Sequence, residues 1–204
     1  MSLTPLTEDQ RDALQEVLNI AMGQAGDSLA RILDAFVELS VPRIRVVDVS
    51  HVADTVREMV GDRHEVTAVR QSFFDDLRGE ALVIFGANGC KDLADLMGYA
   101  EELDQQSERE LLLDVANVLV GAILNGITET LGTELSYSAP SIMAEKAQVE
   151  TLINLDQLSW SHALLLEVNY SLENRDFKSH LLLLMAEEAI DALRGAIDQF
   201  MESI

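Results

Sequence analysis

The chain has little positive charge. Its 204 residues include 14 Lys and Arg against 36 Asp and Glu, which gives a formal net charge of −22. Proteins that bind nucleic acid displace counterions from phosphate with clustered basic side chains, and no stretch of this chain is basic. An anionic membrane surface would repel the chain for the same reason. The composition therefore argues against nucleic acid and anionic membranes as partners.

Cysteine, aromatic residues and long apolar runs are also scarce. The single cysteine, Cys90, excludes an internal disulfide framework. No uninterrupted apolar run approaches the roughly 18 residues of a membrane span, and the N-terminal residues lack the basic and apolar regions of a signal peptide. Only 5% of the residues are aromatic, yet 48% are hydrophobic, which is enough for a core. We therefore expect a soluble cytoplasmic protein of one domain or two small ones.

Hydrophobic periodicity predicts two long helices. Apolar residues at steps of three and four indicate a helix from Thr7 to about Phe36. Ser107, with Glu110 completing a capping box, is expected to begin a second helix that runs to about Leu131 and ends at a glycine. An acidic linker precedes this second helix.

Shorter elements follow each long helix. Residues rich in Val, Ile and Leu between turn signals predict strands at Val41–Val49, Glu65–Phe74, Gly79–Phe85, His162–Tyr170 and Phe177–Met185. Short helices are expected at Asp92–Tyr99 and Glu187–Met201. A turn is expected at Asn174–Asp176, and Val149–Leu155 is left unassigned.

The order of helix, strands and helix occurs twice, and the two halves align with each other. At an offset of 98 residues, the 35 positions from Gln10 to Ile44 contain nine identities without a gap, where about two would arise by chance. The identical pairs are Arg11/Arg109, Leu14/Leu112, Val17/Val115, Asn19/Asn117, Gly23/Gly121, Leu33/Leu131, Ser40/Ser138, Pro42/Pro140 and Ile44/Ile142.

This alignment predicts one α+β domain over residues 1–204, made of two repeats at about 7–100 and about 105–204. The repeats are expected to be related by a pseudo-two-fold axis, with the two long helices adjacent on one face of a continuous β-sheet. A chain that already contains its own two-fold partner is expected to be a monomer.

Polar positions kept by both halves are the candidate functional residues. Steps of 4, 3 and 4 residues place each set on one helix face. The first set is Asp12, Glu16, Asn19 and Gly23, and the second is Glu110, Asp114, Asn117 and Gly121. A solvated helix face is the more common reason for a single acidic-x-x-Asn set. A duplicated Asn favours a task for its amide, because Asn is a mediocre helix former and its amide can donate to and accept from one water.

The paired glycines, Gly23 and Gly121, also need a reason. Glycine inside a helix costs roughly 1 kcal/mol relative to alanine. Two explanations remain open from the sequence: the long helices pack closely there, or a partner approaches the helix backbone.

Signatures of other catalytic machinery are missing. The four histidines, His51, His64, His162 and His180, have no metal-ligand spacing. The sequence has no nucleophile elbow, Walker loop or Cys/His constellation. Cys90 is interpreted as a small apolar residue at a helix start, with a thiol activated by the helix N-terminus as the alternative. We expect no metal site of the chain's own.

The paired motifs resemble the CheC-type phosphatases of bacterial chemotaxis (the CheC/CheX/FliY group). The motif of that family is Asp or Ser, three residues, Glu, two residues, Asn, twenty-two residues, Pro. Asp12, Glu16, Asn19 and Pro42 match it in full, gap included. Glu110, Asp114, Asn117 and Pro140 match the gaps, but Glu replaces Asp or Ser, and Asp replaces Glu. The resemblance extends over essentially the whole chain.

The resemblance implies a function. Such proteins hydrolyse the aspartyl phosphate of CheY-like receiver domains without a covalent intermediate, and the receiver supplies Mg²⁺. By this comparison Asn19 and Asn117 would orient the attacking water, while Glu16 and Asp114 would pair with the receiver's lysine. Asp12, Gly23, Pro42, Glu110, Gly121 and Pro140 would complete the motif surfaces. Because Asp114 is one methylene shorter than Glu, the Asn19 site is expected to carry most of the activity.

Two alternatives stay open at this point. A CheC-like binding module would capture a receiver, or the deamidase CheD, with little chemistry of its own. The second alternative is a structural assembly protein, like the family's flagellar members. The intact Asn in both motif copies favours the enzyme.

Overall fold

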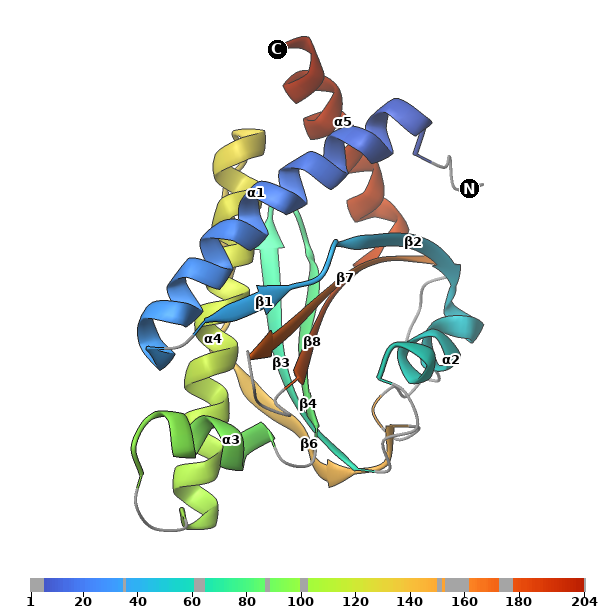
Figure 1. The fold of residues 1–204 in the computed structure, drawn as a ribbon. Coiled ribbons are helices and arrows are strands. Elements are labelled where there is room, and N and C mark those ends of the chain that lie inside the picture. Colours follow the sequence, from blue (N-terminus) through green and yellow to red (C-terminus); the bar gives the residue numbers. More distant parts are fainter. Residues whose placement is uncertain are drawn as a thin grey trace.

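A computed structural model describes residues 6–34, 36–60, 65–86, 89–99, 103–149, 152, 162–172 and 178–203. The fold is α+β, as predicted (Figure 1). Its helices are α1 (Glu8–Leu33), α2 (Val49–Val60), α3 (Gly89–Leu96), α4 (Gln105–Leu131) and α5 (Glu187–Glu202). Its strands are β1 (Val37–Leu39), β2 (Arg43–Asp48), β3 (Val66–Asp75), β4 (Gly79–Gly86), β5 (Leu135–Tyr137), β6 (Ser141–Ala147), β7 (His162–Leu172) and β8 (Lys178–Ala186).

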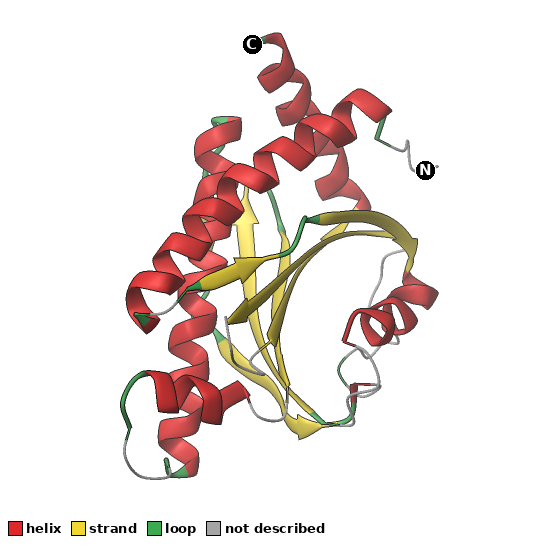
Figure 2. Cartoon of the chain, in the orientation of Figure 1, coloured by secondary structure: helices red, strands yellow, loops and turns green. Residues whose placement is uncertain are grey.

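All of these strands join one continuous antiparallel sheet, which curls as Figure 2 shows. The strand order is β1-β7-β8-β4-β3-β5, with β2 also paired to β7 and β6 also paired to β3. The centre of the sheet is the β4–β8 pair, in which Leu82 lies opposite Leu182. Exchanging each strand for its counterpart four places along the chain gives the same order read from the opposite edge of the sheet. The topology is therefore symmetric about the β4–β8 pair.

The alternation of side chains along the strands builds two apolar layers. Val83, Leu166 and Leu183 point to the face covered by α1, α4 and α5, where the larger core lies. Ile84 and Leu165 point to the opposite face, where Val52 of α2 helps to form a smaller cluster. The two long helices thus share one face of the sheet, as the sequence predicts.

α1 and α4 lie side by side because small residues let their backbones approach. A Cβ added to Gly126 would lie 2.6 Å from Cα of Ala21, which is closer than real Cβ contacts allow. Glycine at 126 therefore fixes the separation of the two helices at this crossing. The close contact lies at Gly126, not at the paired glycines of the motif.

α4 is a core helix. By length and composition alone it is apolar enough to cross a membrane, although polar residues interrupt its sequence. However, 61% of its apolar window is buried inside the fold, against α1 and the sheet. Its ends are well defined: Asp104 caps the N-terminus through a 2.8 Å bond from the Ser107 N–H, and Gly132, at φ 65°, ends the helix.

Several predicted boundaries need correction. Ser107 is not the N-cap of the second long helix, because Asp104 caps it one turn earlier. The first long helix ends at Leu33, where Asp34 adopts a left-handed conformation at φ 48°. The predicted strand Val41–Val49 is β2, and the sequence analysis missed α2, β1, β5 and β6. The turn at Asn174–Asp176 and most of Val149–Leu155 lie outside the described residues.

Candidate functional site

The first motif lies on the exposed face of α1. Asp12, Glu16 and Asn19 are all exposed, and within the described chain their side chains make no hydrogen bond or ion pair. Their spacing aligns them over two turns of one helix face. A capping box between Thr7 and Gln10 secures the start of this helix. The carboxylates and the amide are therefore available to a partner on a fixed scaffold.

The proline of the first motif lies next to the same helix. Pro42 is buried, and its carbonyl oxygen accepts a 2.9 Å hydrogen bond from Nε2 of Gln15. One turn earlier, Nη2 of Arg11 donates to the carbonyl oxygen of Ile44 at 3.1 Å. The 22-residue gap thus brings the start of β2 back against the helix that carries Glu16 and Asn19. This return explains why the motif extends to a distant proline.

The second motif lies on α4, and two of its side chains already make hydrogen bonds within the protein. Glu110, Asp114 and Asn117 are exposed, and Glu110 accepts a 3.0 Å hydrogen bond from Nε2 of Gln106. Oδ1 of Asn117 accepts a 3.1 Å hydrogen bond from Nε2 of Gln71 in β3. The two motif asparagines therefore differ. The amide of Asn19 makes no hydrogen bond in the described structure, whereas the amide oxygen of Asn117 accepts one from the sheet.

Gln71 was missed by the sequence analysis. Its side chain is 1% exposed, and Nε2 also donates to the carbonyl oxygen of Ser138 at 2.7 Å. Because a carbonyl oxygen can only accept, the Gln71 atom between Ser138 and Asn117 must be the nitrogen. The Asn117 atom facing it must then be Oδ1, so the Asn117 amide nitrogen points away. No local pattern signals this contact, which links residues 46 positions apart.

The motif glycines do not mark the contact between the helices. A Cβ at Gly23 would meet nothing within 4 Å, and a Cβ at Gly121 would meet the Tyr137 hydroxyl at 3.3 Å. The explanation by close helix packing is therefore wrong for both positions. The approach of a partner to the backbone remains for Gly23, which is exposed.

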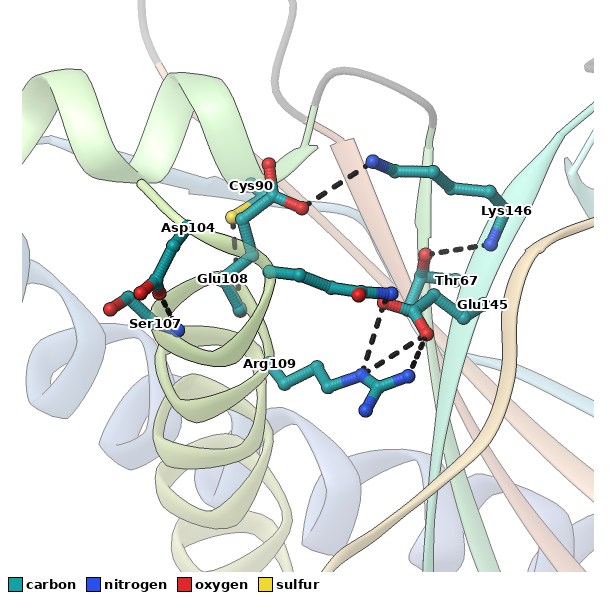
Figure 3. Close-up of polar contacts among 9 residues, drawn as sticks. Thr67, Cys90, Asp104, Ser107, Glu108, Arg109, Glu145 and Lys146 are labelled. Atoms are coloured by element: carbon teal, nitrogen blue, oxygen red, sulfur yellow. Dashed lines mark hydrogen bonds and ion pairs between the residues drawn. The ribbon is translucent and has the colours of Figure 1, made fainter. Parts of the chain in front are cut away.

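A charged cluster adjoins the second motif (Figure 3). Arg109 makes a two-pronged ion pair with Glu145, which lowers the pKa of that carboxyl through hydrogen bonding and raises the pKa of the guanidinium. Lys146 lies 3.4 Å from Glu108. Within this cluster, burial and then the charge of Glu108 raise the pKa of the Cys90 thiol to about 11. Cys90 is half-buried and packs against the larger core, in agreement with the first of the two sequence interpretations.

Two of the described histidines make side-chain contacts within the fold, while His51 is exposed. Nδ1 of His162 lies 2.8 Å from Glu187, and Nδ1 of His180 lies 2.5 Å from Oδ1 of Asn169. In the part of the chain that the structure describes, no group of three His, Cys, Asp or Glu residues has the geometry to hold a metal ion. His64 lies outside the described residues.

Comparison with known proteins places these motifs in context. No family model matches the chain. CheY-P phosphatase CheC of Bacillus subtilis (strain 168) is 21% identical over 203 residues, covering 94% of this chain and 95% of that protein. By sequence this chain is thus similar to the CheC-like proteins over nearly its whole length. Flagellar motor switch phosphatase FliY of the same organism is 21% identical over 142 residues, which is 67% of this CheC-like chain but only 36% of that longer protein.

The fold agrees with this similarity. The crystal structure of FliY from Thermotoga maritima superposes with a TM-score of 0.71 at 20% identity, covering 97% of this chain and all of that one. The FliM middle domain from H. pylori superposes with a TM-score of 0.60 at 11% identity, over 94% and 99% of the two chains. These superpositions establish the architecture alone.

Proposed function

We propose that this CheC-like chain is a phosphatase that hydrolyses the aspartyl phosphate of a CheY-like receiver domain in chemotaxis or two-component signalling, in the cytoplasm. The observation that carries the proposal is the exposed pair Glu16 and Asn19, unpartnered in the described structure and set in a full motif with Asp12 and Pro42. The whole-length similarity to a CheY-P phosphatase supports it.

The proposed chemistry needs no nucleophile from this chain. A water oxygen attacks phosphorus, the bond from phosphorus to the receiver's aspartyl oxygen breaks, and inorganic phosphate leaves. Because the attacking water directs a lone pair at phosphorus, its O–H groups are presented to acceptors, and Oδ1 of Asn19 would be one of them. Glu16 would pair with a basic group of the receiver. The receiver domain would also supply the Mg²⁺ ion. Positioning of this kind can contribute several kcal/mol to catalysis.

The two motif copies are proposed to be unequal. At the second copy, Oδ1 of Asn117 already accepts from Gln71, so turning it toward a water costs a hydrogen bond worth about 1 kcal/mol. Asp114 also reaches less far than Glu16 because its side chain is one methylene shorter. Both differences make Asn19 the principal catalytic amide.

We also propose that the domain is an internal duplication, with repeats at about 7–100 and about 105–204. Two reciprocal serine contacts support it. Ser40 donates its N–H to the Asn169 carbonyl and accepts from the Asn169 N–H, and Ser138 does the same with Ser72. Ser40 and Ser138 each lie two residues before a motif proline. Equivalent contacts at equivalent positions are expected of two copies of one unit.

A non-catalytic binding module is the second candidate, because the fold is shared with a FliM middle domain as well as with FliY. In that case the same α1 surface would capture a receiver, or CheD, without accelerating hydrolysis. The two candidates differ in one measurable quantity, the lifetime of the phosphorylated receiver.

The proposal is tested by phosphorylating candidate receivers from the same genome with a small phosphodonor. Decay of the phosphoryl group is then followed with and without the protein. We expect accelerated decay for at least one receiver. Binding without acceleration for any receiver would replace the enzyme with the binding module.

A further inference from the structure

A groove runs along the N-terminal half of α4. Its volume is about 380 Å³, and its floor includes the buried side chains of Leu111 and Val115. The walls are apolar side chains left in contact with solvent: Ile32 at the end of α1 is 44% exposed, Met97 41% and Tyr99 48%. Neighbouring exposed apolar groups that line one hollow are typical of an interaction site.

The groove opens where α3 stops. The Tyr99 N–H bonds to the Ala94 carbonyl at 3.1 Å, and Gly98 adopts φ 77°, which is the glycine-dependent signal that ends a helix. α3 is 8 residues long, and α5 is 16 residues long. α3 packs on α4 beside the groove, and α5 packs against both long helices (Figure 1).

The contact between α5 and α1 shows what kind of element covers a long helix in this fold. α5 buries Leu193 and Ile197 in the core. Its Asp198 accepts a 2.7 Å hydrogen bond from the side chain of Gln10 in α1. An amphipathic helix is thus the element that seals that side. On the other side the short α3 and the other described residues leave Ile32, Met97 and Tyr99 exposed along the groove.

The acidic side chains along the groove indicate the charge of the partner that would bind there. Glu110 and Asp114 line the groove, and among the described residues no basic side chain lines it. The helix α5 carries five carboxylates and one arginine, so α5 of a second copy would be repelled. Groove residues from Ser107 to Val118 span about 16 Å of helix, the length of roughly three turns.

We propose that this groove binds a short amphipathic helix of a partner protein, about three turns long, with an apolar face for Ile32, Met97 and Tyr99 and basic side chains for Glu110 and Asp114. Helix-in-groove recognition of this type uses apolar anchors at helical spacing and charges at the edges. The inference goes beyond the proposed function and does not depend on it, because the occupant need not be the receiver substrate.

The test uses the full chain and two synthetic helical peptides of 14 residues. Both carry Leu at positions i, i+3, i+4 and i+7; one has Lys on its flanks and the other has Glu. Binding is measured by fluorescence anisotropy. We expect the Lys peptide to bind, to weaken as salt rises, and to bind at least about 10-fold more tightly than the Glu peptide. Equal binding of the two peptides, or no binding of either, would overturn the proposal.

Two methionines provide a matched control for the location. Met97 lies in the groove at 41% exposure, and Met143 lies on β6, away from the groove, at 40% exposure. We expect Met97→Ser to weaken binding of the Lys peptide several-fold and Met143→Ser to leave it unchanged. In methyl-labelled protein, the Met97 signal is expected to shift on adding the peptide while the Met143 signal stays fixed. Equal effects at both residues would contradict the assignment.

A third peptide tests the competing occupant. It has the sequence of α5, Glu187–Glu202, and represents a second copy of the chain. We expect it to bind at least about 10-fold more weakly than the Lys peptide, because its carboxylates oppose those of the groove. Binding as tight as that of the Lys peptide would mean that the groove is a self-association surface, and would overturn the proposal. No receiver enters any of these experiments, so failure of the phosphatase proposal would leave their outcome unaffected.

Discussion

Gln71 donates a 3.1 Å hydrogen bond to Oδ1 of Asn117, from a buried position in the sheet to an exposed position on α4. The same nitrogen holds the carbonyl oxygen of Ser138, two residues before Pro140. One buried amide therefore connects the helix and the proline segment of the second motif. In the first motif an α1 residue, Gln15, makes the connection to Pro42 instead, and the side chain of Asn19 makes no hydrogen bond to any described residue.

Releasing Asn117 should strengthen the second site. Gln71→Met removes the donor at similar volume, so Oδ1 of Asn117 becomes free to accept from a water. In an Asn19→Ala background, where activity depends on Asn117, we expect Gln71→Met to raise kcat for receiver dephosphorylation by about 5-fold, the value of one hydrogen bond. KM should change little. Gln199→Met, an exposed change on α5, is the matched control. A fall in kcat would show that Gln71 supports Asn117 instead of withdrawing it.

Two glycines of the long helices should respond oppositely to alanine. At Gly23 an added Cβ meets nothing, so Gly23→Ala should raise the free energy of unfolding by up to about 1 kcal/mol through helix propensity. At Gly126 the Cβ meets the Ala21 backbone, so Gly126→Ala should lower it by about 1–3 kcal/mol. Urea denaturation measures both.

Gly23→Ala also tests the approach of a partner. If the receiver comes close to the α1 backbone there, the stabilised variant should show a raised KM for the phosphorylated receiver. An unchanged KM would remove Gly23 from the docking surface, while leaving the stability prediction intact.

Glu16 should contribute through its charge. Glu16→Gln keeps the shape and removes the carboxylate, so we expect a higher KM and a weaker dependence of association rate on salt. Glu129→Gln, an equally exposed change near the far end of α4, is the control and should leave both unchanged. Equal effects from the two variants would mean that the net charge of −22 attracts the receiver, and that Glu16 has no special part.

Cys90 should react slowly with alkylating agents. Burial raises its pKa to about 11, so the thiolate, which is the reactive form, is scarce at pH 8. We expect iodoacetamide to modify the folded protein about 100-fold more slowly than the urea-unfolded chain at pH 8. Because the pKa is raised, the rate should climb as the pH approaches 11. Similar rates for folded and unfolded chains at pH 8 would contradict the raised pKa of this half-buried thiol.

The sequence predicted the elements whose signals are local. Apolar spacing over several turns located α1 and α4, and the glycine at 132 located the end of α4. α2 was missed because it begins at Val49, directly after the β-branched run of β2, so the strand pattern continues into it. Ser107 was mistaken for the N-cap because Asp104, three residues earlier, offers an equally good capping side chain.

The sequence predicted the positions of the candidate site but not its surroundings. Helical spacing alone shows that Asp12, Glu16 and Asn19 share a face. The contact from Gln71 to Asn117, the groove beside Met97 and the close crossing at Gly126 each join segments far apart in the chain. Such contacts depend on how the layers pack, and no short-range pattern encodes them.

The most direct test of the account is the decay of a phosphorylated receiver in the presence of three single variants. Asn19→Ala and Asn117→Ala remove the two motif amides, and Asn125→Ala removes an exposed amide of α4 outside the motif. We predict that Asn19→Ala slows the catalysed decay on the order of 100-fold, that Asn117→Ala has a smaller effect, and that Asn125→Ala has none. Near wild-type activity of Asn19→Ala, with activity abolished by Asn117→Ala, would contradict the account.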